Sequence, residues 1–321
     1  MMQRGTLSLC VLLVLMASSA QAERIIAARY AEPAERYGHY ALGRPHEYAR
    51  LVATTDAGRD AVLALPADEV FEDLAPRLVR LADQAPPALL VIVSARDGGS
   101  RLALVGLDGR RLEIVAQSVP IGRPNRWLNP VGVADLSGDG EAEIAAVTTP
   151  HIGGVLRVYR RRGERLVEIA SLGGFSNHVY GASQLALSRP ARIAGRLQLL
   201  VPDRRRETIR VIRLTEAGLV ESARCRPSEP VTGPEALDDC ERRLNQEGSV
   251  GPGHPGRPSI SPGWRRHDER QARASRRDLA RDGARGDAHG PAGGRSRPVR
   301  RGGGSASRRI RSQPPAGTGE A

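Results

Sequence analysis

A repeated hairpin pattern limits the folds open to this chain. Short runs that alternate apolar and polar residues recur at intervals of about 52–54 residues, and a period of two is typical of a half-buried β-strand. Each run is followed by a glycine-containing loop, such as Asp108-Gly109, and by a second apolar run, which together are a strong hairpin signal. The first runs are residues 49–55, 101–107, 155–160 and 208–214, and the second are 61–65, 112–116, 166–170 and 219–223.

Two further strand-like runs complete each of the first three periods. One lies at residues 78–81, 131–135 and 184–187, and the next at residues 89–93, 143–147 and 197–201. Four short strands in a period of about 54 residues are typical of a β-propeller blade. The sequence therefore predicts an all-β, propeller-like array of about four blades over residues 23–224. The alternative is an antiparallel sandwich with coincidental spacing.

The fourth period ends after its hairpin, near Arg224. A repeat unit cannot bury both of its faces alone, so the end of the array needs a cover. Either residues 24–40 supply a closing strand, or a part of the array is missing downstream.

An acidic loop joins two of the predicted strands, and its oxygen spacing suits a calcium ion. Calcium takes six to eight oxygen ligands. Loop positions 1, 3, 5 and 9 offer the side chains of Asp135, Ser137, Asp139 and Glu143, and position 7 offers the backbone carbonyl of Glu141. An EF-hand needs a glutamate at position 12, where this chain has Ala146, so we expect a strand–loop–strand site. The alternative is a polar turn without an ion.

This acidic motif, placed within a propeller period, resembles the FG-GAP/VCBS repeats of exported bacterial proteins and of integrin alpha-chain propellers. The resemblance covers roughly residues 45–223 and implies one Ca²⁺ with a structural role. The corresponding loops of the neighbouring periods, residues 81–87 and 187–192, lack the acidic spacing. We therefore expect a single ion site.

A second group of residues lies in loops that would meet at one mouth of the propeller, where such folds usually bind ligands. These candidate ligand residues are Asn125, Trp127, Asn129, His151 and His178. They are also explained as residues that pack loops and form turns. Neither a nucleophile elbow nor a phosphate-binding loop accompanies them, so we expect a non-enzymatic protein. The alternative is an exported hydrolase or lyase with a site near His151 and His178.

The first 22 residues have the pattern of a secretory signal peptide: Arg4, an apolar run, and Ala20-Gln21-Ala22 as a cleavage site. The apolar run is shorter than the roughly 20 residues of a membrane span, so we expect an exported protein, periplasmic or extracellular, without a transmembrane anchor. In that compartment Cys225 and Cys240 could form a disulfide, a pairing that the sequence leaves open.

Residues 225–321 are rich in arginine, glycine and proline and poor in apolar residues. This composition predicts either a disordered tail or the product of a frameshift. Much of the net charge of +12 lies here, so a weaker alternative function is binding of anionic polymers through this basic segment. Aromatic residues are nearly absent from it, and we do not expect a nucleic-acid partner. The sequence predicts an exported calcium-binding scaffold whose partner is an unidentified protein or glycan.

Overall fold

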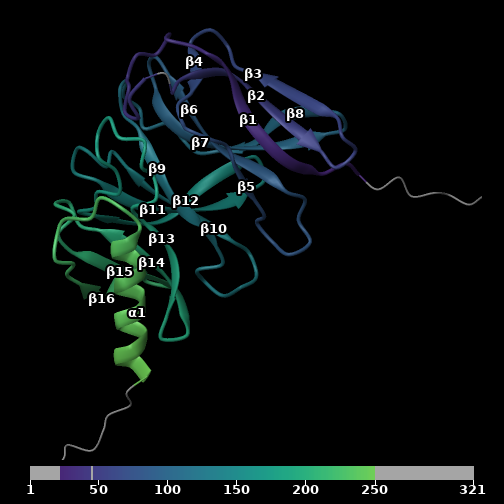
Figure 1. Ribbon diagram of the computed structural model, residues 1–321. Helices are drawn as coiled ribbons and strands as arrows, with labels where there is room; N and C mark the ends of the chain where they lie inside the picture. The colour runs from purple at the N-terminus through teal and green to yellow at the C-terminus, as the bar shows by residue number, and fades with distance from the viewer. Residues whose placement is uncertain (1–21, 45, 250–321) are drawn as a thin grey trace, which may run out of the picture. The chain divides into compact units, whose positions relative to one another are not determined.

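The computed structural model describes residues 22–44 and 46–249. The predicted signal peptide (except Ala22) and the predicted tail beyond residue 249 lie outside this range. The described chain is mostly β, with a long curled sheet like half a barrel, a second four-stranded sheet and one helix (Figure 1). The elements are β1 (Ile25–Pro33), β2 (Tyr48–Thr55), β3 (Asp60–Ala64), β4 (Glu69–Phe71), β5 (Arg77–Val79), β6 (Ala88–Ala95), β7 (Gly99–Asp108), β8 (Arg111–Gln117), β9 (Leu128–Ala134), β10 (Glu143–Thr148), β11 (Val155–Arg162), β12 (Arg165–Gly173), β13 (Arg189–Ile193), β14 (Arg196–Pro202), β15 (Ile209–Thr215), β16 (Gly218–Cys225) and α1 (Glu235–Ser249).

All four predicted hairpins are confirmed. β2 pairs with β3, β7 with β8, β11 with β12 and β15 with β16, each antiparallel. The turn glycines supply the backbone conformation that these tight connections need. Gly109, for example, has φ +57°, which glycine adopts without the steric cost that a Cβ atom brings.

Antiparallel meanders are the building units of both sheets. The consecutive strands β5–β8, β9–β12 and β13–β16 each form a four-stranded meander, while β1, β2 and β3 form a three-stranded one. The short strand β4 links β2 to β6, and a single parallel pair joins β8 to β12. The first three meanders and β4 therefore form one continuous twelve-stranded sheet. β1 pairs with β2 and therefore does not close the array onto β16.

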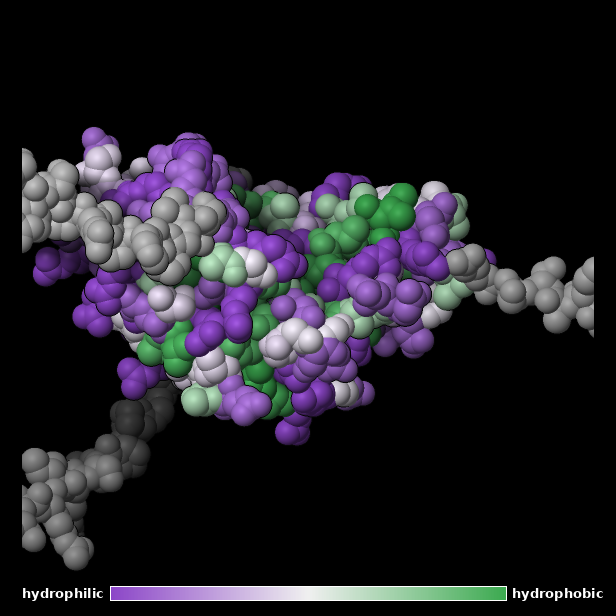
Figure 2. Space-filling view, turned by 90° about the horizontal axis from the view of Figure 1, so that it is seen from below, coloured by the Kyte–Doolittle hydropathy of each residue, from purple (hydrophilic) through white to green (hydrophobic). Residues whose placement is uncertain are grey.

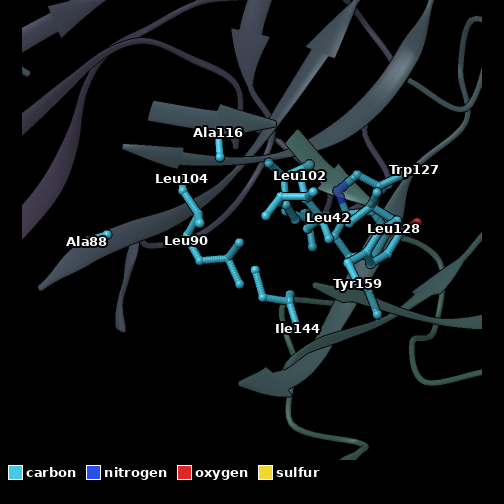
Figure 3. Packing of buried hydrophobic residues seen from close by; sticks show 14 residues of the cluster. Leu42, Ala88, Leu90, Leu102, Leu104, Ala116, Trp127, Leu128, Ile144 and Tyr159 are labelled. Atoms are coloured by element: carbon cyan, nitrogen blue, oxygen red, sulfur yellow. The ribbon is translucent and has the colours of Figure 1, made fainter. Parts of the chain in front are cut away.

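The hydrophobic cores lie between successive meanders. Strand β6 is buried on both faces, and its side chains alternate between two cores: Leu90 and Ile92 point into one, Leu89 and Val91 into the other. Strand β10 divides its side chains in the same way. A strand buried on both faces reads as a continuous apolar run, because each face needs its own apolar set. Figure 3 shows one of these cores, where Leu90, Leu104 and Ile144 approach one another and Trp127 lies further along the same core, near Leu128.

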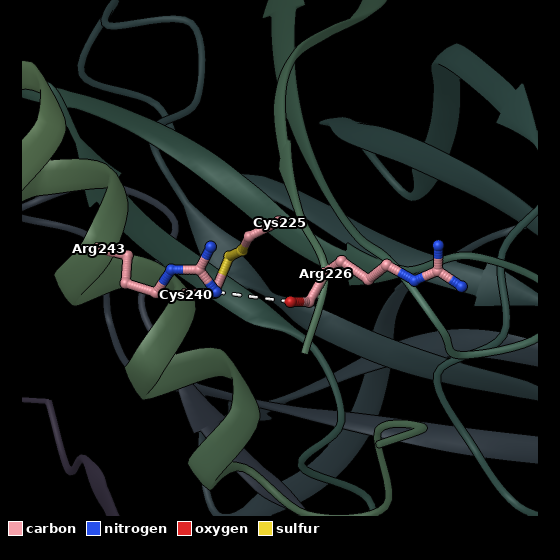
Figure 4. Close-up of a disulfide and its surroundings, with 4 residues drawn as sticks. All are labelled: Cys225, Arg226, Cys240 and Arg243. Atoms are coloured by element: carbon pink, nitrogen blue, oxygen red, sulfur yellow. Dashed lines mark hydrogen bonds between the residues drawn. A yellow bond between two sulfur atoms is a disulfide. The ribbon is translucent and has the colours of Figure 1, made fainter. Parts of the chain in front are cut away.

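Helix α1 covers the outer face of the last meander, which corrects the predicted change to a tail at residue 225. Leu237 and Cys240 pack with β13–β15 in a common core, and a disulfide joins Cys240 to Cys225 at the end of β16 (Figure 4). The acidic residues Glu235 and Asp238 in the first turn favour the helix through its dipole. The sequence therefore encodes a cover for the open face within residues 225–249.

One predicted strand is wrong. Residues 184–187 lie in the loop before β13, which begins at Arg189. The carbonyl of Leu185 accepts a hydrogen bond from the side chain of Asn129, at 3.1 Å, in place of a strand ladder. Leu187 is nevertheless fully buried. The apolar alternation therefore predicted the burial of this segment correctly but its conformation incorrectly.

Within the part of the chain that the structure describes, no helix is long and apolar enough to cross a membrane.

Candidate functional site

Loops from several meanders converge at one place and hold one another there. The backbone N–H of Asn125 donates to Oη of Tyr37 at 2.8 Å. Tyr180 donates its hydroxyl to the carbonyl of His39, also at 2.8 Å, across 141 residues of sequence. The N–H of Gly181 donates to the carbonyl of Ala41. These bonds join the loop after β12 and the loop after β8 to the connection between β1 and β2.

A pocket of about 200 Å³ lies at this junction. Exposed apolar side chains reach it: Ile152 is 62% exposed and Tyr180 is 58% exposed. On the face of the molecule drawn in Figure 2, apolar side chains lie in small areas among hydrophilic ones. Apolar surface beside polar groups in a pocket is typical of a binding site. The residues that line this pocket include His39, Asn125, Arg126, Trp127, His151 and Tyr180.

A chain of hydrogen bonds determines the tautomers of two histidines. Nε2 of His178 lies 2.9 Å from the carbonyl of Ala182, and since a carbonyl only accepts, this nitrogen carries the proton. Nδ1 of the neutral His178 ring is then the acceptor for Nε2–H of His151, at 2.8 Å. Nδ1 of His151 consequently keeps its lone pair, and no described residue donates to it.

Trp127 forms the floor of this group. It is 1% exposed, and its indole N–H donates to the carbonyl of Glu72 at 3.0 Å. The indole stacks on His151 with ring centroids 6.2 Å apart and meets the edge of His178 at 4.8 Å. Trp127 therefore holds both imidazole rings in place while it anchors its loop to Glu72, the residue that directly follows β4.

His39 is paired with a buried carboxylate. Its Nδ1 donates to Oε1 of Glu72 at 2.8 Å, and the second oxygen of Glu72 accepts from Ser94. Burial raises the pKa of Glu72, and the hydrogen bond from His39 acts in the opposite direction. Nε2 of His39, the second ring nitrogen, has no described hydrogen-bond partner.

Burial also keeps His151 uncharged. Its pKa is lowered to about 4, first by desolvation and then by the nearby His178, His39 and Arg206. The pKa of His178 is lowered as well, mainly by burial. At neutral pH the pair is therefore uncharged and keeps the tautomers described above.

Four of the five candidate ligand residues lie together, and one does not. Asn125, Trp127 and His151 line the pocket, and His178 lies directly behind it. Asn129 is fully buried instead and donates to the carbonyls of Asn177 and Leu185. Sequence reasoning missed His39, Glu72 and Tyr180, because they meet only through contacts between segments far apart in the chain.

The acidic loop has the predicted position between β9 and β10. Both carboxylate oxygens of Asp135 accept backbone N–H groups: Oδ1 from Gly138 and Asp139, and Oδ2 from Gly140. Oε2 of Glu143 accepts the N–H of Leu136 at 2.8 Å. The loop thus forms closed turns around its own acidic side chains.

The oxygen atoms of this loop, as they are arranged, do not fit a calcium ion. Arg160 lies 2.8 Å from Oδ2 of Asp139, donates to Oγ of Ser137 at 3.0 Å and contacts Oε1 of Glu143. Glu141, the proposed carbonyl ligand, has its side chain 3.7 Å from Arg162. Within the described residues, no group of three or more histidine, cysteine, aspartate or glutamate side chains could hold a metal ion.

No protein-family model and no curated protein matches the chain.

Proposed function

We propose that the chain is an exported, non-catalytic binding module that holds one sugar ring of a glycan in the pocket between His39 and His151. One observation carries the proposal: two imidazole rings, each held by a hydrogen bond, line the same small pocket. Nδ1 of His151 is an acceptor for a hydroxyl group, and Nε2 of His39 is a second polar atom with which a hydroxyl group can form a hydrogen bond.

The other pocket residues complement these two ring nitrogens. The ring of Tyr180 is 58% exposed and offers an apolar platform. The guanidinium of Arg126 supplies hydrogen-bond donors at the rim, so a hydroxyl finds both donors and acceptors. The volume of about 200 Å³ is smaller than the roughly 300–1,000 Å³ of sites for drug-sized ligands, and a single sugar ring is a unit of suitable size.

We further propose that the four meanders are blades of a small β-propeller related to the FG-GAP/VCBS repeats. The regular packing of each meander on the next supports this assignment. In place of ring closure, α1 covers the last meander. The Cys225–Cys240 disulfide supports export, because disulfides persist in oxidising compartments. The proposed function does not depend on calcium at Asp135–Glu143, where Arg160 contacts the expected ligands.

Glycan-array screening of the full chain, followed by calorimetric titration of the best ligand, tests the proposal. We expect Tyr180→Ala and His151→Phe each to weaken binding at least about tenfold, because each removes a contact worth about 1.4 kcal/mol or more. Val119→Ser is the matched control, since Val119 is 86% exposed and does not line the pocket. The absence of any glycan ligand, or equal binding by all variants, would refute the proposal.

The His39–Glu72 pair favours a second candidate function, an exported hydrolase or lyase. A histidine backed by a buried carboxylate is an arrangement that serves general base catalysis. Incubation of the bound glycans with the protein distinguishes the two functions, because only an enzyme releases new reducing ends or unsaturated products. In the enzymatic case Glu72→Gln stops turnover while binding persists.

A further inference from the structure

We infer that Arg160 is the resident cation of the loop between β9 and β10, in the place that the acidic spacing assigns to Ca²⁺. Its Nη1 lies 2.8 Å from Oδ2 of Asp139. Its Nη2 donates to Oγ of Ser137 at 3.0 Å and to Oε1 of Glu143. The guanidinium thus binds three of the four side chains predicted to coordinate calcium.

Burial makes the contact between Arg160 and Glu143 important for the stability of the fold. The side chain of Glu143 is 0% exposed and that of Arg160 is 15% exposed. A buried carboxylate needs a partner, since an unpaired charge away from water is costly. Glu143 and Asp139 in turn raise the pKa of Arg160, with Glu143 as the largest cause. The cation required by Glu143 is therefore supplied by the chain itself.

Strand register explains why Arg160 reaches the loop. β10 and β11 pair antiparallel, with Ile144 opposite Tyr159. One step further along the ladder, Arg160 comes opposite Glu143, at the point where the loop joins β10. Cross-strand neighbours lie close enough for their side chains to pair. An ion pair between two neighbouring strands thus takes the place of the predicted metal site, whose ligands all lie within nine consecutive residues.

The arrangement disfavours calcium for two physical reasons. A Ca²⁺ ion bound at about 2.3–2.6 Å from the oxygens of Asp139 and Glu143 would lie beside the guanidinium, and like charges at such distances repel strongly. In addition, both oxygens of Asp135 already accept backbone N–H groups. Binding of the ion would require Arg160 to leave and these turns to open.

Arg160→Gln tests the inference, because it removes the charge and retains a polar side chain. We expect the wild-type chain to melt at the same temperature in millimolar CaCl₂ and in chelator. We expect Arg160→Gln to melt lower in chelator and to gain about 2–4 °C in CaCl₂, with binding heat in a CaCl₂ titration. The double variant Arg160→Gln, Asp139→Asn should lose this gain.

Arg162→Gln is the matched control, because Arg162 faces Glu141 at 3.7 Å from an exposed position. It should leave the response of the protein to calcium unchanged. Calcium binding by the wild-type chain as tight as that of Arg160→Gln would overturn the inference, and so would a folded Arg160→Gln that ignores calcium.

A measurement on the unaltered protein keeps the test valid if Arg160→Gln does not fold. The backbone amides of Gly138 and Gly140 donate to Asp135, and their NMR signals report directly on the loop. We expect millimolar CaCl₂ to leave these signals in place. Saturable shifts of both signals would overturn the inference, whether or not the pocket binds a glycan.

Discussion

Nε2 of His151 lies 2.8 Å from Nδ1 of His178, and the second nitrogen of His178 is held by the carbonyl of Ala182. This bond joins the loop after β10 to the loop after β12, and it leaves Nδ1 as the nitrogen of His151 that is free to accept a hydrogen bond. An added proton goes to the free Nδ1 of His151, and it places a charge on a partly desolvated ring near His178, His39 and Arg206.

Acid should therefore destabilise the fold through His151. Its pKa is about 4 in the folded chain against an ordinary value of 6.5, so the unfolded chain binds more protons between these two values. The stabilisation is fully present above pH 6.5 and is lost as the pH falls towards 4. After allowance for solvent screening of the partly exposed ring, we expect a loss of about 2 kcal/mol.

Urea unfolding at a series of pH values measures this loss, with His151→Gln as the comparison. The variant should show a flatter pH profile in this window. Glu72 and Asp73 have raised pKa values and contribute with the opposite sign, but they are present in both proteins and cancel in the difference. Parallel profiles for the two proteins would contradict the prediction.

The disulfide should contribute substantially to stability. Cys225 and Cys240 are 15 residues apart, and closing a loop of this length stabilises a fold by about 3 kcal/mol in the chain-entropy model. Replacing both residues with serine should lower the free energy of unfolding in urea by about that amount. A reducing agent should destabilise the wild type to a similar degree and leave the double variant unchanged. A wild type indifferent to reduction would show that the bond is not formed.

Two glycines with positive φ should differ sharply in their tolerance of alanine. A Cβ atom at Gly154 would collide with the carbonyl of Phe175, whereas one at Gly163 would meet nothing within 4 Å. Gly163→Ala should cost about 1 kcal/mol from backbone strain alone. Gly154→Ala should cost more than about 3 kcal/mol, because backbone must move as well. Chemical denaturation of both variants gives the comparison, and equal losses would show that the loop near Gly154 adapts freely.

The buried ion pair of Asp73 and Arg77 should matter more than an exposed one. The side chain of Asp73 is 0% exposed, and burial raises its pKa. Arg77→Met should destabilise the fold by about 3 kcal/mol at neutral pH, since it leaves a buried charge unpaired. Arg29→Met is the control, because Arg29 and Asp60 are largely exposed and 3.9 Å apart, and it should cost less than about 1 kcal/mol.

The pH dependence of Arg77→Met provides an independent check. As the pH falls, Asp73 becomes protonated and no longer needs a cation, so the difference from the wild type should shrink. Thermal melts at neutral pH and near pH 4 measure this change. A constant difference between the two conditions would assign the loss to packing of the arginine side chain.

Much of the strand order followed from local pattern. The four hairpins and the strand–loop–strand unit around Asp135–Glu143 were predictable, because alternation and turn glycines act between neighbouring residues. The proximity of Trp127, His151 and His178 was also predictable, since loops at one end of successive sheets must meet. The loop at residues 184–187 shows the limit of this approach: the alternation there marked Leu187 for burial, but Asn129 and not a neighbouring strand holds the segment.

The sequence by itself determined the repeating strands, their turns and the acidic spacing, because these depend on interactions over a few residues. Only the tertiary structure decided which distant groups complete them. His39 meets Glu72 and Tyr180, Arg160 meets Glu143, and α1 covers β13–β15. Such contacts depend on strand register and on the packing of one sheet against the next. No repeating pattern in the sequence predicts these contacts, because the free energy that favours them comes from burying surfaces that are far apart in sequence.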